Sequence, residues 1–235
     1  MDAAFFLRRR THFIRRYYIT GIGPFREIQR KIDAQETPYD EPPPFFDPED
    51  GEPAFLEEWI EADEAAQVVG RSAVSLLSDS LKLYFKALEQ QLAFRLSLEG
   101  KATAKKKGFV AAYRGALGEV LGTDWTNCPV RFDVIEQIVL ARNRAQHGLQ
   151  LSILRPWHDP KTLTKHHDLI FASEEELKMW VDEGADPDTW FAPQLEITEE
   201  SLGAAITEVE KLADWIEERI SDVRARRCGR DQKDP

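Results

Sequence analysis

Apolar residues recur at helical spacing over most of the chain, and this pattern predicts a mainly α-helical protein. The clearest stripe lies between Ala54 and Leu98, in a stretch that contains no proline. Its apolar residues are spaced three and four positions apart, as on one face of a helix. They are Ala66, Val69, Ala73, Leu77, Leu81, Tyr84, Leu88 and Leu92. We therefore expect one long amphipathic helix here, which ends at Glu99-Gly100.

Three more helices continue the pattern. Residues 104–121 place Phe109, Tyr113, Leu117 and Val120 on one face, and Gly122 supplies a stop. The next helix is expected to have Pro129 at its first position and to end near Gly148. The last helix follows Thr198, a residue type that caps helix N-termini well.

The segment between the last two helices has a different pattern. Residues 149–153, 168–172 and 194–197 are short, partly alternating stretches that are typical of strands. Between them, Ser173 and Glu176 form a capping box that opens a short helix. The sequence therefore predicts a small α+β insertion at about residues 150–197.

The N-terminal part is separated from these helices by a proline-rich segment. Residues 5–35 read as one or two short helices interrupted at Gly21–Pro24. Residues 37–53 hold six prolines among acidic residues and are expected to form an extended linker. The predicted organisation is a basic helical N-terminal extension (1–36), an acidic linker (37–53), a helical domain (54–227) and a disordered tail (228–235).

Charge is strongly segregated along the chain. The formal net charge of −11 argues against general, charge-driven binding of nucleic acid, but not against a site that is basic only locally. Between Met1 and Ile32, eight Arg/Lys face two acidic residues, whereas residues 33–64 hold thirteen acidic residues and no basic one. The basic and acidic blocks could attract each other, or attract a partner, through their opposite charges. Alternatively, they are a solvated basic helix followed by an acidic linker.

Composition narrows the class of protein. The only two cysteines, Cys128 and Cys228, provide neither a disulfide framework nor a cysteine-rich metal site. No apolar run approaches the roughly 18 residues of a membrane span. The order of Phe5-Phe6-Leu7 before arginines is the reverse of a secretory signal. We expect a cytoplasmic protein that is not bound to a membrane. Adjacent histidines such as His166-His167 point to opposite faces of a strand, so we expect no metal site there.

The helix that begins near Pro129 carries the most informative chemistry. An α-helix advances about 100° per residue, which places Val134, Ile138, Ala141 and Ala145 on the core side. A separate arc of roughly 140° holds Arg142, Asn143, Gln146 and His147. Arginine matches phosphate oxygens with a planar fork, and histidine transfers protons near neutral pH. This arc therefore suits the cleavage of a phosphodiester.

The segment Arg142-Asn143-x3-His147 resembles the Arg-x(4–6)-His motif of HEPN domains, in which a polar residue, often Asn, follows the arginine. The resemblance covers about residues 53–220, with the motif late in the third helix and a loop containing Trp125 and Pro129 before it. It implies a HEPN-like four-helix bundle with a small α+β insertion before the last helix. In that family two domains pair, and both motifs face a shared cleft that cuts RNA without metal.

By this resemblance we expect the chain to be a metal-independent endoribonuclease that needs no cofactor. His147 would be the general base or acid, Arg142 would stabilise charge in the transition state, and Asn143 would orient His147 or the substrate. Weaker candidates for substrate binding are Gln146, Arg144, Lys106 and Lys107. Leu140 lies on the polar arc, where a single chain would leave its apolar side chain exposed. We therefore expect a homodimer that pairs through this helix.

An alternative comes from another class of protein. Proteins with this motif often serve as toxins or defence effectors, so an antitoxin protein is an expected partner besides RNA. The chain could instead be a non-catalytic HEPN-like module that binds a protein, such as an antitoxin or a nucleotidyltransferase-like subunit. Arg142 would then be a surface cation, and His147 would cap the helix. Likewise, Lys105–Lys107 with Arg114 either steer RNA or form a solvated face.

Overall fold

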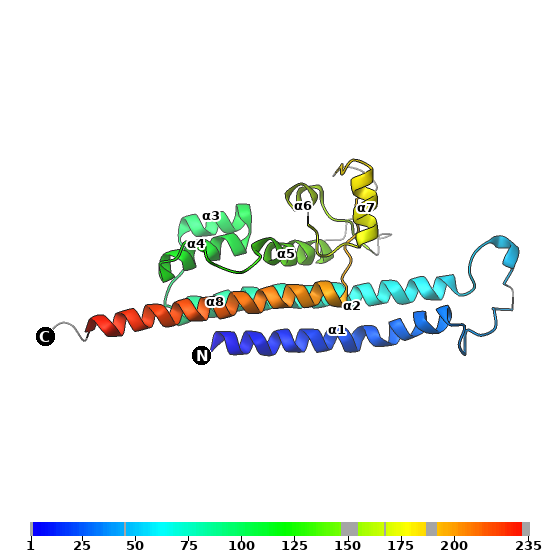
Figure 1. Cartoon of the computed structure of the whole chain (residues 1–235), viewed down its shortest axis with the longest axis horizontal. Helices are drawn as coiled ribbons and strands as arrows, with labels where there is room; N and C mark the ends of the chain where they lie inside the picture. The colour runs from blue at the N-terminus through cyan, green and yellow to red at the C-terminus, as the bar shows by residue number, and fades with distance from the viewer. Residues whose placement is uncertain (1, 45, 147–154, 167, 187–191, 232–235) are drawn as a thin grey trace. The chain divides into compact units, whose positions relative to one another are not determined.

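A computed structural model describes residues 2–44, 46–146, 155–166, 168–186 and 192–231 of the chain (Figure 1). Within these ranges the fold is mainly helical, as the sequence predicts. The helices are α1 (Ala3–Asp33), α2 (Leu56–Gln91), α3 (Leu98–Lys107), α4 (Phe109–Leu121), α5 (Phe132–Gln146), α6 (Pro160–Lys165), α7 (Glu174–Asp182) and α8 (Glu199–Asp231). Among the described helices, none has both the length and the apolar character needed to cross a membrane.

The chain divides into two compact units, each assembled from separate stretches of sequence. Unit 1 comprises Met1–Phe13, Leu76–Val139 and Gly203–Pro235. Unit 2 comprises Ile14–Ser75 and Leu140–Leu202. Parts of α1 and α2 therefore belong to each unit.

The first helix, α1, is continuous, so the predicted interruption at Gly21–Pro24 is wrong. A proline inside a helix costs roughly 3 kcal/mol, partly through the lost backbone hydrogen bond. Burial on both sides of Pro24 offsets this cost, since Tyr18 and Gln29 are both buried. Tyr18 also donates its hydroxyl to the carbonyl oxygen of Ile197, at 3.1 Å. Apolar and polar contacts on either side of the proline therefore hold α1 together.

The long second helix confirms the predicted stripe but not its predicted end. Six of the eight apolar residues of the predicted stripe are buried, namely Ala66, Ala73, Leu77, Leu81, Tyr84 and Leu88. The helix ends at Gln91, because Ala93 takes a left-handed conformation (φ 51°) and Phe94 donates to the carbonyl of Glu89 at 3.0 Å. These features form a Schellman motif.

The helix predicted at 104–121 is two helices, α3 and α4. Ser97 caps α3 by accepting a hydrogen bond from the Gly100 amide at 3.0 Å, so Glu99-Gly100 lies in a first turn instead of at a helix end. Gly108 separates the two helices with a φ of 87°, which side-chain-bearing residues rarely adopt. The predicted stop at Gly122 is confirmed, with a left-handed φ of 63°.

The fifth helix begins three residues later than predicted, at Phe132 instead of Pro129. The buried carboxylate of Glu208 on α8 accepts a hydrogen bond from the Arg131 amide at 2.8 Å. This contact anchors the backbone immediately before the helix. The start of α5 is thus fixed by a residue far away in the sequence.

Unit 1 has a core of apolar and aromatic side chains. Phe85 on α2 stacks on Tyr113 on α4 with ring centroids 4.8 Å apart. Trp125 stacks on Trp215 of α8 at 4.6 Å, and its indole N–H donates to the carbonyl of Arg114. Other fully buried side chains of unit 1 are Leu77, Leu81, Leu88, Leu117, Ile135, Ile138, Leu212 and Ile216.

The insertion in unit 2 is helical, and its predicted sheet is wrong where the structure describes it. Residues 149–153 lie outside the described residues, and neither 168–172 nor 194–197 forms a strand. The described residues contain one isolated antiparallel bridge, between Trp157 and Gln194. Pro156 and Pro193 flank this bridge and have no amide N–H, so the ladder cannot extend through them.

Two short helices, α6 and α7, complete the described part of the insertion (Figure 1). Leu163, Leu169 and Trp180 form a small core there. Ser173 caps α7 by accepting from the Glu176 amide at 3.1 Å, as predicted. The carboxylate of Glu176 accepts from the Gln194 amide at 2.7 Å and so ties α7 to the last segment of the insertion. Thr198 and Ser201 cap α8 reciprocally, which confirms the predicted cap.

Residues 37–53 contain no α-helix in the part that the structure describes. They form turns and bends with one short 3-10 helix, η1 (Pro48–Asp50). At the other end of the chain, α8 continues to Asp231, past residue 228, where a disordered tail was predicted.

Candidate functional site

The candidate motif occupies the end of α5, and one of its residues lies outside the described part of the chain. The core side of α5 follows the helical wheel: Val134, Ile138 and Ala141 are buried. On the polar arc, Asn143 and Gln146 are exposed and Arg142 is half-buried, whereas His147 lies outside the described residues.

The structure brings Arg142 and Asn143 into direct contact. Arg142 Nη1 donates a hydrogen bond to Asn143 Oδ1 at 3.2 Å. A guanidinium and a carboxamide therefore lie side by side near the C-terminal end of α5. A guanidinium keeps its charge at any physiological pH and can bind two phosphate oxygens at once.

The neighbouring arginine has a different environment. Arg144 is half-buried, and its Nε donates to the backbone carbonyl of Trp157 at 2.5 Å. The contact joins α5 to the first described residues of the insertion. Arg144 therefore holds the protein backbone through its Nε, whereas the prediction from the sequence gave it a weak role in binding substrate.

The other predicted substrate contacts, Lys106 and Lys107, are exposed in the last turn of α3 in unit 1. Cations at a helix C-terminus interact favourably with the helix dipole. Arg114, the other cation named with them, is also exposed, and its guanidinium lies over the ring of Phe132 at 4.1 Å.

Unit 2 also contains a cluster of charged residues that the sequence pattern did not reveal. Arg155 pairs with Asp63 and lies 3.5 Å from Glu64, and all three side chains are mostly buried. Nearby Arg71 is buried as well, and this burial lowers its pKa. Asp63 and Arg155 are 92 residues apart, so no local spacing could have indicated the pair. The cluster ties α2 to the start of the described insertion.

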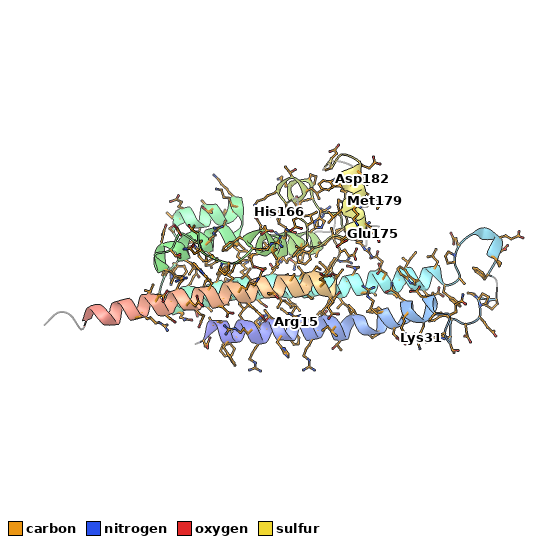
Figure 2. All side chains as sticks on the ribbon, in the orientation of Figure 1. Arg15, Lys31, His166, Glu175, Met179 and Asp182 are labelled. Atoms are coloured by element: carbon orange, nitrogen blue, oxygen red, sulfur yellow. The ribbon has the colours of Figure 1, made fainter. Side chains whose placement is uncertain are left out.

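Two histidines of the insertion are buried, and they do not form a metal centre with a third ligand in the described residues. His158 Nε2 lies 2.9 Å from the carbonyl oxygen of Phe171, and burial lowers its pKa. His166, labelled in Figure 2, is the C-cap of α6, and His167 lies outside the described residues. The described residues contain no group of three or more His, Cys, Asp or Glu that could hold a metal ion.

Comparison with known proteins does not indicate a family or a function for this chain. No model of a protein family, no curated protein and no solved structure matches the chain.

Proposed function

We propose that this chain is a metal-independent endoribonuclease of HEPN type, with Arg142, Asn143 and His147 as its catalytic residues. The observation that carries the proposal is the contact between Arg142 and Asn143 near the C-terminal end of α5, five and four residues before His147 in the sequence. The resemblance of the motif and the mainly helical fold add support.

The proposed reaction is attack by a ribose 2′-hydroxyl on the adjacent phosphorus. The bond between phosphorus and the 5′-oxygen breaks, which leaves a 2′,3′-cyclic phosphate and a free 5′-hydroxyl. His147 would take the proton from the 2′-hydroxyl or give one to the leaving 5′-oxygen. Arg142 would stabilise the extra negative charge on the phosphorane-like transition state, and Asn143 would orient His147 or the substrate.

The proposal includes a homodimer in which two copies of the motif share one RNA cleft. Its basis is the resemblance together with Leu140, which lies on the polar arc of α5. Leu140 is half-buried within the single chain, so only part of its side chain is available to a second copy.

Cleavage of unstructured RNA by the full chain in EDTA tests the proposal. His147→Ala should slow cleavage by roughly 10²–10⁴-fold, the usual contribution of general acid–base catalysis. Arg142→Lys should also be slower, because an ammonium keeps the charge but loses the planar fork. Arg95→Lys, at an exposed arginine of unit 1, is the matched control and should cut as the wild type does.

The products provide a second criterion, since the proposed reaction leaves cyclic phosphate ends. Cleavage that persists undiminished in His147→Ala would refute the assignment. Absence of cleavage by a folded wild-type chain would favour the non-catalytic module.

A further inference from the structure

A groove between α1 and α2 in unit 1 is separate from the motif in sequence and belongs to the other compact unit. It has a volume of about 370 Å³, within the range of roughly 300–1,000 Å³ that is usual for small-ligand pockets. Phe6 and Arg10 line it from α1, and Leu83 and Lys86 line it from α2. Small side chains such as Ala3 and Ala87 leave the space open.

The groove is positively charged although the whole chain is acidic. Its lining contains Arg10 and Lys86 and no carboxylate. Arg10 Nε donates to Ser80 Oγ at 2.9 Å, which holds the guanidinium at the groove. Within the described part of the chain, neither Arg10 nor Lys86 forms an ion pair. An anionic ligand would therefore not need to displace an existing carboxylate.

Large apolar side chains are exposed at the same place. Phe6 and Leu83 are 48% and 49% exposed, and the neighbouring Phe5 is 49% exposed. The rings of Phe5 and Phe6 meet edge to face at 5.3 Å, and the guanidinium of Arg9 lies 6.0 Å from the Phe5 ring. Aromatic rings beside cations give a surface on which flat, electron-rich groups can stack.

We propose that this groove is a docking site for single-stranded RNA. An unpaired base would stack on Phe6 in the groove, and the flanking phosphates would contact Arg10 and Lys86. The inference rests on the proposed function, because that function makes RNA the expected polyanion. It assigns RNA contacts to a surface that the motif does not include.

The chemistry of the groove favours RNA over an acidic peptide. A single strand of RNA repeats a flat ring and a phosphate at every step, and the groove offers rings and cations together. Sequence-tolerant proteins for single strands use this combination of stacking and charge. Acidic peptides have the charge but lack the repeated ring, so a competition experiment distinguishes the two partners.

The test measures binding without cleavage. The full chain is titrated into a short, fluorescein-labelled oligouridine whose 2′-O-methyl groups remove the attacking hydroxyl, and fluorescence anisotropy is followed between about 50 and 200 mM KCl. Phe6→Ala should weaken binding by about 5- to 150-fold, the equivalent of one stacked base. Phe6→Tyr keeps the ring and should bind nearly as the wild type does.

The contribution of Arg10 and Lys86 is measured separately, from the dependence of RNA affinity on salt concentration. Each phosphate contact in single-stranded RNA contributes about 0.7 to the slope of log K against log salt, so Arg10→Ala with Lys86→Ala should reduce this slope by about 1.4. Leu98→Ala and Lys101→Ala, on exposed positions of α3, are the matched controls and should leave both affinity and slope unchanged. Circular dichroism establishes that every variant is folded.

Three outcomes would overturn the inference: no binding by the wild type, equal binding by Phe6→Ala, or equally strong competition by polyglutamate. None of them alters the result of the cleavage assay. Conversely, groove-dependent binding by a wild-type chain that fails to cut unmodified RNA would support the docking site and refute the proposed ribonuclease.

Discussion

Gly70 lies where α2 meets the last segment of the insertion in unit 2, and we predict that even Gly70→Ala is unfavourable there. A Cβ at this position would lie 2.7 Å from Ile197 Cβ and 3.2 Å from its Cγ2. Favourable carbon–carbon contacts are about 3.5–4.0 Å, so Ile197 would have to move by close to 1 Å. The backbone of Ile197 is held on two sides, by Gln67 at its amide (3.0 Å) and by Tyr18 at its carbonyl (3.1 Å).

Two opposing contributions determine how Gly70→Ala changes the free energy of unfolding. Alanine is favoured over glycine inside a helix by about 1 kcal/mol. Overpacking a core costs typically about 1–3 kcal/mol. Gly115→Ala on α4 is the matched control, because a Cβ there meets nothing within 4 Å and only the favourable term remains. The free energy of unfolding should therefore be lower for Gly70→Ala than for Gly115→Ala by about 1–3 kcal/mol.

Urea denaturation with an unchanged m-value measures both variants. Ile197→Ala should be less harmful in the Gly70→Ala background than in the wild type, with a coupling free energy of about 0.5–3 kcal/mol. If Gly70→Ala stabilises the protein as much as Gly115→Ala does, the close packing of Gly70 on Ile197 is refuted.

Three further predictions concern the site and its surroundings. Arg144→Gln should lower the free energy of unfolding by about 1–3 kcal/mol, because the Trp157 carbonyl loses its hydrogen-bond donor. The folded variant should still cut RNA. An unchanged free energy of unfolding would contradict the structural role of Arg144. Burial lowers the pKa of His158 in the folded state. As the pH falls below about 6.5, the unfolded chain therefore binds a proton at this histidine that the folded chain does not bind. Stability should fall from pH 7 to 5 by up to about 1.4 kcal/mol per pH unit, and this loss should be smaller in His158→Gln. Light scattering at micromolar concentration should show a dimer, and a monomer would contradict pairing through α5.

The helices and several of their caps could be predicted because their signals are local. The stripe of α2 depends only on residues three and four positions apart, and Ser173 and Thr198 bond to amides in their own first turns. The left-handed Gly122 is equally local. Such features are determined by neighbours along the chain.

The errors occur where distant residues decide the structure. Pro24 remains in a helix because burial on both sides compensates for the lost hydrogen bond. The start of α5 depends on Glu208, 77 residues from Arg131. Short alternating segments resembled strands, but Pro156 and Pro193 prevent the only described bridge from growing. At the candidate site, the sequence indicated the arc that holds Arg142 and Asn143, but not the role of Arg144, whose partner is a backbone carbonyl in the insertion.

The distribution of unit 1 along the sequence constrains how the chain is made by the ribosome. Arg8 pairs with Asp214, which is 206 residues away, and Thr11 donates to Glu210 at 2.5 Å. At a synthesis rate of about 5–20 residues per second, the N-terminal segment waits roughly 10–40 s before these partners exist. During this interval Arg8 and Thr11 lack their partners on α8. Unit 1 can therefore be completed only after its last segment, Gly203–Pro235, has been made, and a chain that stalls before residue 203 presents an unfinished core to chaperones and proteases.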